Sequence, residues 1–249
     1  MNTSTRDYIL TIEDLGVSFD GFKAVDGFNF YLDENTVHVI IGPNGAGKTT
    51  VLDLICGKTR ATSGSVKFKG KEMRGKREYR IVRAGIGRKF QNPSIFENLT
   101  VIENLEISHP SGRGILACLL FRRTPAIDQQ MRAVAAEIGL LEKLNTEAGI
   151  LSHGQKQWLE IGMLLMQNPE IIMLDEPVAG MSVRERTETA ALIRRISQNR
   201  SVIVIEHDME FVREIADRVT VMHLGHILSE GSMEKVSSDP KVIEVYIGH

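Results

Sequence analysis

The alternation of hydrophobic and polar residues changes character along the chain. Near the start, apolar side chains occupy every second position between residues 8 and 12 and again between residues 28 and 32. A period of two predicts antiparallel strands with one buried face. We therefore expect a β-rich layer at the beginning of the fold.

Three continuous apolar runs predict strands that are buried on both faces: VHVII at 37–41, IIML at 171–174 and SVIVI at 201–205. The first run leads into a Gly-rich turn and a helical pattern, and a second helical pattern at 183–197 separates the other two. Buried strands that alternate with helices are typical of an α/β fold with a mostly parallel sheet.

The segment between residues 99 and 168 has the period of amphipathic helices, most clearly at 101–107 and 128–141. The Pro- and Gly-rich HPSGRG and the basic FRRTP interrupt it. We expect a helical subdomain over 99–168 that is inserted into an α/β core made of 1–98 and 169–249. The whole chain of 249 residues is then one domain.

Composition narrows the classes of protein. Hydrophobic residues make up 42% of the chain and charged residues 25%, as in ordinary soluble proteins. The net charge of −2 and the mixing of charges argue against nucleic acid as a partner. Cys56 and Cys118 lie far apart in apolar runs, which favours two core thiols in a reducing compartment. No apolar run is long enough to span a membrane, so we expect a chain that is neither secreted nor membrane-spanning by itself.

The sequence GPNGAGKTT at 42–50 fits the pattern G-x-x-x-x-G-K-[ST] directly after a predicted strand. Polyphosphate binding needs converging backbone N–H groups, which glycines allow, and a helix that points its positive end at the anion. Lys48 supplies charge for the β- and γ-phosphates, and the Thr49 hydroxyl is a ligand for Mg²⁺. The residues expected to bind nucleotide here are Gly42, Pro43, Asn44, Gly45, Ala46, Gly47, Lys48, Thr49 and Thr50.

The sequence IIMLDEP ends a predicted buried strand with two adjacent carboxylates. Asp175, at the strand end, is expected beside the phosphates as a ligand for Mg²⁺. Glu176 points elsewhere and is suited to accept a proton from the water that attacks the γ-phosphate. The alternative is a pair of acids at a helix start, which the preceding buried run argues against.

Gln91 in KFQNPSIF and His207 in VIEHDM each follow a predicted strand. Alone, such a glutamine is usually a loop residue and such a histidine a structural group. Ligands of α/β folds bind beyond the carboxyl ends of the strands, where both residues lie. We therefore predict catalytic roles for both, with Gln91 also a metal ligand.

The sequence LSHGQKQWLEIG at 151–162 joins a polar head to an amphipathic helix. The Ser152 hydroxyl, the N–H groups of residues 153 and 154 and a helix that starts near Gln155 together offer a second anion site. The alternative is that Ser152 is only a helix cap.

These motifs, in this order over practically the whole chain, resemble the ATP-binding subunit of ATP-binding-cassette (ABC) transporters. The resemblance implies a P-loop fold, ATP and Mg²⁺ as cofactors, and head-to-tail pairs of subunits. The signature of one subunit, here Ser152, His153, Gly154 and Gln155, then caps the ATP held by the other. The resemblance also implies that Phe19 stacks on adenine; Phe22 is the competitor and a core role the alternative.

Two positions depart from the family pattern. His153 replaces a glycine of the usual LSGGQ, so its side chain must point away from the phosphates. The segment VAGMS at 178–182 lacks the aspartate that the family usually has there, so the contacts of that aspartate do not transfer.

Within the family, the segment PVAG and the ending VIEVYIGH are similar to importers of the branched-chain amino-acid and urea/amide class. The motifs DEPVAGM and EHDMEFV are most similar to the D-type ATPase subunit of urea importers. This similarity implies import of urea or short amides, driven by this chain and a second, identical or related ATPase subunit. Membrane permeases and, indirectly, a substrate-binding protein would complete the assembly at the cytoplasmic face of the membrane.

Other functions remain open from the sequence. Branched-chain amino-acid import and lipopolysaccharide export are the nearest alternatives, followed by a non-transport ABC protein and a soluble P-loop kinase or metabolic ATPase. The insertion at 108–125 contains GILACLLFRR, which either packs on its own subdomain or, with the loop at 91–97, receives short helices of the membrane subunits.

Overall fold

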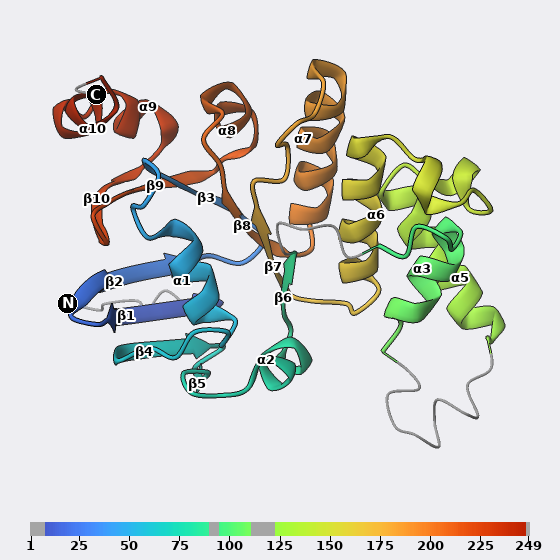
Figure 1. The fold of residues 1–249 in the computed structure, drawn as a ribbon, viewed down its shortest axis with the longest axis horizontal. Coiled ribbons are helices and arrows are strands. Elements are labelled where there is room, and N and C mark those ends of the chain that lie inside the picture. Colours follow the sequence, from blue (N-terminus) through green and yellow to red (C-terminus); the bar gives the residue numbers. More distant parts are fainter. Residues whose placement is uncertain (1–7, 90–94, 111–122, 248–249) are drawn as a thin grey trace, which may run out of the picture.

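The computed structural model describes residues 8–89, 95–110 and 123–247, and Figure 1 shows their arrangement. Two sheets lie side by side, with a group of helices beyond the far edge of the second. Within the described ranges the first sheet has the strand order β2-β1-β4-β5 and the second β10-β9-β3-β8-β7-β6.

The first sheet is the predicted antiparallel layer. Its strands are β1 (Leu10–Phe19), β2 (Phe22–Leu32), β4 (Ser63–Phe68) and β5 (Lys71–Glu72). The pair β1–β2 runs in register from Leu10 opposite Leu32 to Phe19 opposite Phe22 at the hairpin tip. The alternating apolar residues of both strands are buried, as their period of two requires.

The second sheet confirms the prediction of a mostly parallel sheet. Its strands are β3 (Val37–Ile41), β6 (Ile86–Lys89), β7 (Ile171–Asp175), β8 (Ser201–Ile205), β9 (Arg218–His223) and β10 (His226–Gly231). Only β10 among them pairs antiparallel, with β9. Every residue of β3, β7 and β8 is buried, which explains why the sequence shows continuous apolar runs there.

Helices α3 (Val101–Ser108), α5 (Pro125–Glu137) and α6 (His153–Leu165) lie between β6 and β7 in sequence, with the 3₁₀ turns Leu141–Lys143 and Ala148–Ile150. The other helices are α1 (Lys48–Ile55), α2 (Glu78–Ala84), α7 (Val183–Ser197), α8 (Met209–Ile215), α9 (Met233–Ser237) and α10 (Pro240–Ile247). In α6 the indole N–H of Trp158 donates to Thr189 of α7 over 2.8 Å, which ties the helical group to the α/β core. The division of the chain at 99 and 168 stays a prediction.

Helix α5 corrects the helix expected at 128–141. It begins at Pro125, because Thr124 caps it and accepts a hydrogen bond from the N–H of Ile127. It ends at Glu137, because Gly139 takes a left-handed φ of 72° and the chain turns. Helix α6 likewise begins at His153, slightly before the start near Gln155 that the sequence suggested.

The second sheet separates two apolar clusters. Val39 and Ile41 of β3 face the cluster that contains the helical group, α7 and α8. Ile40 between them faces the opposite cluster, formed with the antiparallel layer and α1. Cys56 lies in this second cluster, as predicted for a core thiol, whereas Cys118 is outside the described residues. In the part of the chain that the structure describes, no helix is long and apolar enough to cross a membrane.

Candidate active site

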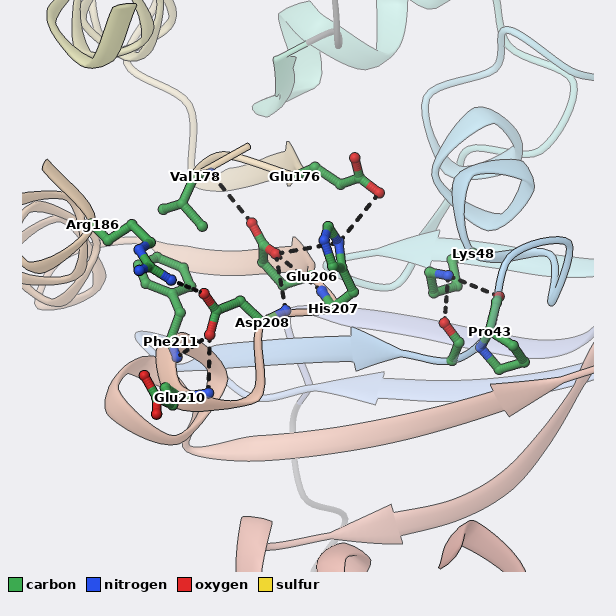
Figure 2. Close-up of polar contacts among 11 residues, drawn as sticks. Pro43, Lys48, Glu176, Val178, Arg186, Glu206, His207, Asp208, Glu210 and Phe211 are labelled. Carbon is green, nitrogen blue, oxygen red and sulfur yellow. Dashed lines mark hydrogen bonds and ion pairs between the residues drawn. The ribbon is translucent and has the colours of Figure 1, made fainter. Parts of the chain in front are cut away.

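The carboxyl ends of three neighbouring parallel strands meet at one edge of the second sheet. Strand β3 leads into the loop at 42–50, β7 ends at Asp175, and β8 is followed by Glu206 and His207. Figure 2 shows Lys48, Glu176 and His207 at this edge. The fold therefore brings together the motifs that the sequence keeps far apart.

The loop at 42–50 passes so close to its neighbours that two of its positions require glycine. A Cβ atom on Gly42 would lie 2.3 Å from the carbonyl oxygen of Met222, and one on Gly47 would lie 2.6 Å from that of Ala24. Gly47 also has a φ of 99°, in the left-handed region. The loop is thus packed closely against the backbone at Ala24 and Met222 just before α1 begins.

Lys48 is the first residue of α1 and folds back into the loop. Its Nζ donates to the carbonyl oxygens of Gly42, over 2.7 Å, and Pro43, over 3.0 Å (Figure 2). Burial lowers the pKa of Lys48, while the carboxylates of Glu176 and Asp175 oppose that shift. A cation at this place, next to a helix N-terminus, is suited to bind a polyphosphate.

Asp175 is 1% exposed at the end of β7. Its Oδ2 pairs with Arg88 Nη2 at 3.3 Å, and Arg88 also forms an ion pair with Asp53. Burial raises the pKa of Asp175, whereas Arg88 and a hydrogen bond from Thr49 act in the opposite direction. Arg88 was not predicted from the sequence, where its only signal is a cation within the short run GIGRKF.

The other oxygen of the Asp175 carboxylate, Oδ1, is buried and has no hydrogen-bond partner among the described residues. A buried carboxylate oxygen without a donor, beside a threonine hydroxyl, is a donor set that suits a hard cation such as Mg²⁺. Within the described ranges no group of three or more His, Cys, Asp or Glu side chains could hold a metal ion. Mg²⁺ at this edge would therefore take part of its ligands from phosphate and water.

Glu176 and His207 face each other across the ends of β7 and β8. His207 Nδ1 lies 3.7 Å from Glu176 Oε1 (Figure 2), and the two side chains are 66% and 36% exposed, so solvent reaches both. Glu176 has a φ of 48°, unusual for a residue with a side chain, and its N–H donates to the carbonyl of Ile205 over 2.9 Å. Its carboxylate lies toward His207.

Glu206 is a further carboxylate that the sequence analysis missed, although it directly precedes His207. It is buried and accepts hydrogen bonds from the N–H groups of Val178 (3.2 Å), His207 (3.0 Å) and Asp208 (3.5 Å), as Figure 2 shows. Burial raises its pKa. Glu206 thus connects the segment after β7 to the end of β8 and holds His207 in place through its backbone.

The signature region at 152–155 forms the beginning of α6. Ser152 is the N-cap: its hydroxyl accepts from the N–H of Gln155 over 3.3 Å, and the Gln155 side chain accepts from the N–H of Ser152 over 3.2 Å. The His153 ring contacts the carbonyl of Ala179 through Nε2 at 3.0 Å. Because a carbonyl only accepts, Nε2 carries the proton, and the imidazole is turned toward the segment at 178–182.

The remaining predicted residues fall in different places. Phe19 and Phe22 lie at the tip of the β1–β2 hairpin and are 47% and 68% exposed, so both rings are accessible. In Figure 1, α6 with the signature and α1 with the phosphate loop lie on opposite sides of β6 and β7. Gln91 and most of the insertion at 108–125 are outside the described residues.

Comparisons with known proteins agree with this geometry. The profile of the ABC transporter family matches residues 25–179. The high-affinity branched-chain amino acid transport ATP-binding protein BraF of Pseudomonas aeruginosa is 37% identical over 251 residues, which cover 96% of this chain and 98% of BraF. LivG of Escherichia coli strain K12, which carries the same description, is 36% identical over 249 residues, with coverages of 96% and 98%.

A solved structure of an ATP-binding cassette of an ABC transporter in its ADP conformation superposes with a TM-score of 0.86. It is 33% identical in sequence and covers 97% of this chain and 99% of the solved one. The fold is that of the P-loop ATPases of ABC transporters, and the chain belongs to this family as a nucleotide-binding, ATP-hydrolysing subunit.

Proposed function

We propose that this chain powers an importer by binding and hydrolysing ATP as one of two ATPase subunits attached to membrane permeases. The curated relatives named above are described as transport ATP-binding proteins, and this chain covers 98% of their length. The second subunit is a further copy of this chain or a related cassette.

Branched-chain amino acids are the cargo that we place first, because BraF and LivG are described as transporting them. Urea and short amides, which the motifs DEPVAGM and EHDMEFV suggested, come second since no named relative supports them. A substrate-binding protein outside the membrane would select the cargo, and this chain acts at the cytoplasmic side.

The residues at the sheet edge have separate tasks in this reaction. Lys48 and the N–H groups of the loop at 42–50 bind the β- and γ-phosphates, and Phe19 stacks on the adenine. Thr49 and Asp175, with Gln91, would hold Mg²⁺, which would neutralise charge on the phosphates. The buried oxygen of Asp175 that lacks a donor supports this assignment.

Glu176 acts as the general base in this proposal. It takes the proton of the attacking water while the bond between the γ-phosphorus and the bridging oxygen breaks, and the products are ADP and phosphate. His207, 3.7 Å from Glu176, contacts the γ-phosphate and orients the carboxylate.

The observation that carries the proposal of pairing is the separation of the two anion sites. The phosphate loop precedes α1 and the signature precedes α6, on opposite sides of β6 and β7 (Figure 1). A single chain therefore does not close its own signature over its own phosphate loop. Two chains in head-to-tail order would give each ATP both a loop and a signature.

The variant Glu176→Gln tests both the base and the pairing. We expect ATP turnover to fall by about a thousandfold, the range of general-base effects, while ATP affinity is kept. With ATP and Mg²⁺ the variant should then elute as a dimer from a sizing column, because slow hydrolysis leaves ATP bound between the two subunits. Glu188→Gln, an exposed carboxylate on α7, is the control and should behave like the unmodified chain.

Normal turnover of Glu176→Gln would remove Glu176 from the role of base. A variant that binds ATP tightly yet stays monomeric at saturating nucleotide would contradict the paired arrangement.

A further inference from the structure

The carboxylate of Glu185, in the first turn of α7, lies on the signature of its own chain. Its Oε1 accepts a hydrogen bond from the Ser152 hydroxyl over 2.8 Å and a second from the N–H of Gly154 over 3.2 Å. Both belong to the signature that, in the proposed pairing, faces the ATP of the partner subunit. An anion therefore already occupies this place when the chain is alone.

The fit between this carboxylate and the signature is close. A Cβ atom on Gly154 would lie 2.7 Å from Glu185 Cδ and 2.7 Å from Oε1, so the carboxylate in this position uses the space that a larger residue at 154 would fill. Hydrogen bonds from the backbone of Ser182 and the hydroxyls of Ser152 and Ser182, with a smaller contribution from the N–H of Gly154, lower the pKa of Glu185 to about 2. The group is consequently an anion at any physiological pH.

We propose that Glu185 holds the place of the ATP γ-phosphate at the signature of the unpaired chain, and that the nucleotide of the partner subunit displaces it during closure. This inference rests on the proposed function, in which ATP is bound between two subunits.

The Glu185 carboxylate and the γ-phosphate compete for the same two hydrogen-bond donors. The Ser152 hydroxyl has one proton, and the Gly154 N–H has one, so each serves either the carboxylate or a phosphate oxygen. Two anions on the same pair of donors also repel each other. The Glu185 carboxylate must therefore leave before the γ-phosphate takes up its contacts.

The other oxygen of Glu185 allows the carboxylate to leave the signature while the start of α7 stays folded. Oε2 accepts from the N–H of Ser182 over 3.0 Å and from its hydroxyl over 2.8 Å. The first of these bonds, with the bond from the Glu185 N–H to Ser182 Oγ over 3.3 Å, is the capping box of α7. The carboxylate can turn about this fixed cap and release Ser152. Glu185 thus raises the ATP concentration that is required for the two subunits to close. It is a positioning residue rather than a catalytic one.

A purely structural role for Glu185 predicts a different result from a matched substitution. Glutamine also forms the second half of a capping box, so Glu185→Gln can keep the cap of α7 through its amide oxygen. The charge is lost, and the oxygen that accepts from Ser152 and Gly154 is replaced by an NH₂ group, which donates. The neighbouring Glu188, which pairs with Arg184 at 2.9 Å, offers the control change Glu188→Gln on the same helix.

The experiment uses the Glu176→Gln chain, in which ATP should accumulate the dimer. Sedimentation velocity at increasing ATP with excess Mg²⁺ gives the ATP concentration at half dimerisation. We expect Glu185→Gln in this background to lower that concentration about tenfold and Glu188→Gln to leave it unchanged. Glu185→Asp, which keeps the charge but shortens the reach to Ser152, should lower it as well.

An unchanged or higher ATP requirement for Glu185→Gln, in a variant whose unfolding temperature matches that of its parent, would overturn the inference alone. A Glu176→Gln parent that stays monomeric at saturating ATP would overturn the proposed pairing and the inference together. The two failures are therefore separable in one data set.

Discussion

His38 is a buried residue whose charge is set by its surroundings in the middle of β3. Its Nε2 lies 2.8 Å from the Thr220 hydroxyl, which in turn donates to Glu230 over 2.8 Å. The Phe30 ring covers the imidazole at 4.4 Å between centroids. Because the hydroxyl gives its proton to Glu230, the imidazole is the donor toward Thr220.

Burial, and then the charge of Arg218, lower the pKa of His38 to about 3 from 6.5. Between these two values the unfolded chain binds a proton that the native chain does not, so acid favours unfolding. We expect this one group to remove up to about 1.4 kcal/mol of the free energy of unfolding for each pH unit below about 6.5. Urea unfolding of His38→Gln between pH 7 and pH 5 should show a shallower loss than the unmodified chain.

His226→Gln changes an exposed histidine on β10 and serves as the control. If the pH dependence of His38→Gln equals that of this control, the neutral buried imidazole is not responsible.

Individual site residues differ in how far the sequence reveals them. Lys48, Glu176 and His207 each follow a buried apolar run within a few residues, so the pattern of the strands also locates the site. Glu185 does not follow from such a pattern, because its contact with Ser152 joins segments 33 residues apart. In the sequence, Glu185 is visible only as the fourth residue of a capping box.

At the level of elements, a buried ion pair connects β6 with α6. Lys89 Nζ lies 3.2 Å from Glu160 Oε2, and the two side chains are 3% and 6% exposed. Strand β6 leads toward Gln91, and α6 begins with the signature, so the pair fixes the position of the signature helix against the edge that holds the nucleotide.

Removal of one partner should leave a buried charge, and we expect Lys89→Met to lower the free energy of unfolding by about 3–5 kcal/mol. The double change Lys89→Met with Glu160→Leu should recover most of that loss, since no buried charge remains. Urea unfolding measures both. Lys156→Met, which breaks an exposed pair with Glu97, should cost less than about 1 kcal/mol. A double variant as unstable as the single one would contradict this account.

The existence and type of the strands and of α7 could be predicted because their periods are strong and local. The ends of α5 could not be read from the same period. Leu140 and Leu141 continue its apolar spacing, and only the left-handed turn at Gly139 stops the helix. The residues that mark the two ends of α5 are the N-cap Thr124 and the glycine after Ile138. Both lie outside the repeating apolar pattern.

For the molecule as a whole, nucleotide binding should appear as added stability. A ligand at about a hundred times its Kd stabilises the folded state by about 2.7 kcal/mol, which for a chain of this size raises the unfolding temperature by about 5–10 °C. We expect ATP with Mg²⁺ to raise the unfolding temperature in this way and Lys48→Ala to abolish the rise. Differential scanning calorimetry measures the shift, with the exposed Lys71→Ala as control.

A full ATP-dependent shift in Lys48→Ala would mean that the loop at 42–50 is not where the nucleotide binds.

The contact between two chains cannot be read from the hydrophobic pattern or seen in one folded chain. Each chain provides only one half of the proposed contact.

The alternating strands of the second sheet have a consequence for how such a chain diverges. On β7, Ile172 and Leu174 pack toward the helical group, whereas Ile171 and Met173 pack toward the antiparallel layer and α1. Neighbouring residues of one strand thus belong to two different apolar clusters, which only the backbone of the sheet separates. Substitutions in the cluster with the helical group can therefore adapt that side to a different membrane partner. They do not require repacking of the cluster that contains α1 and lies beside the phosphate loop.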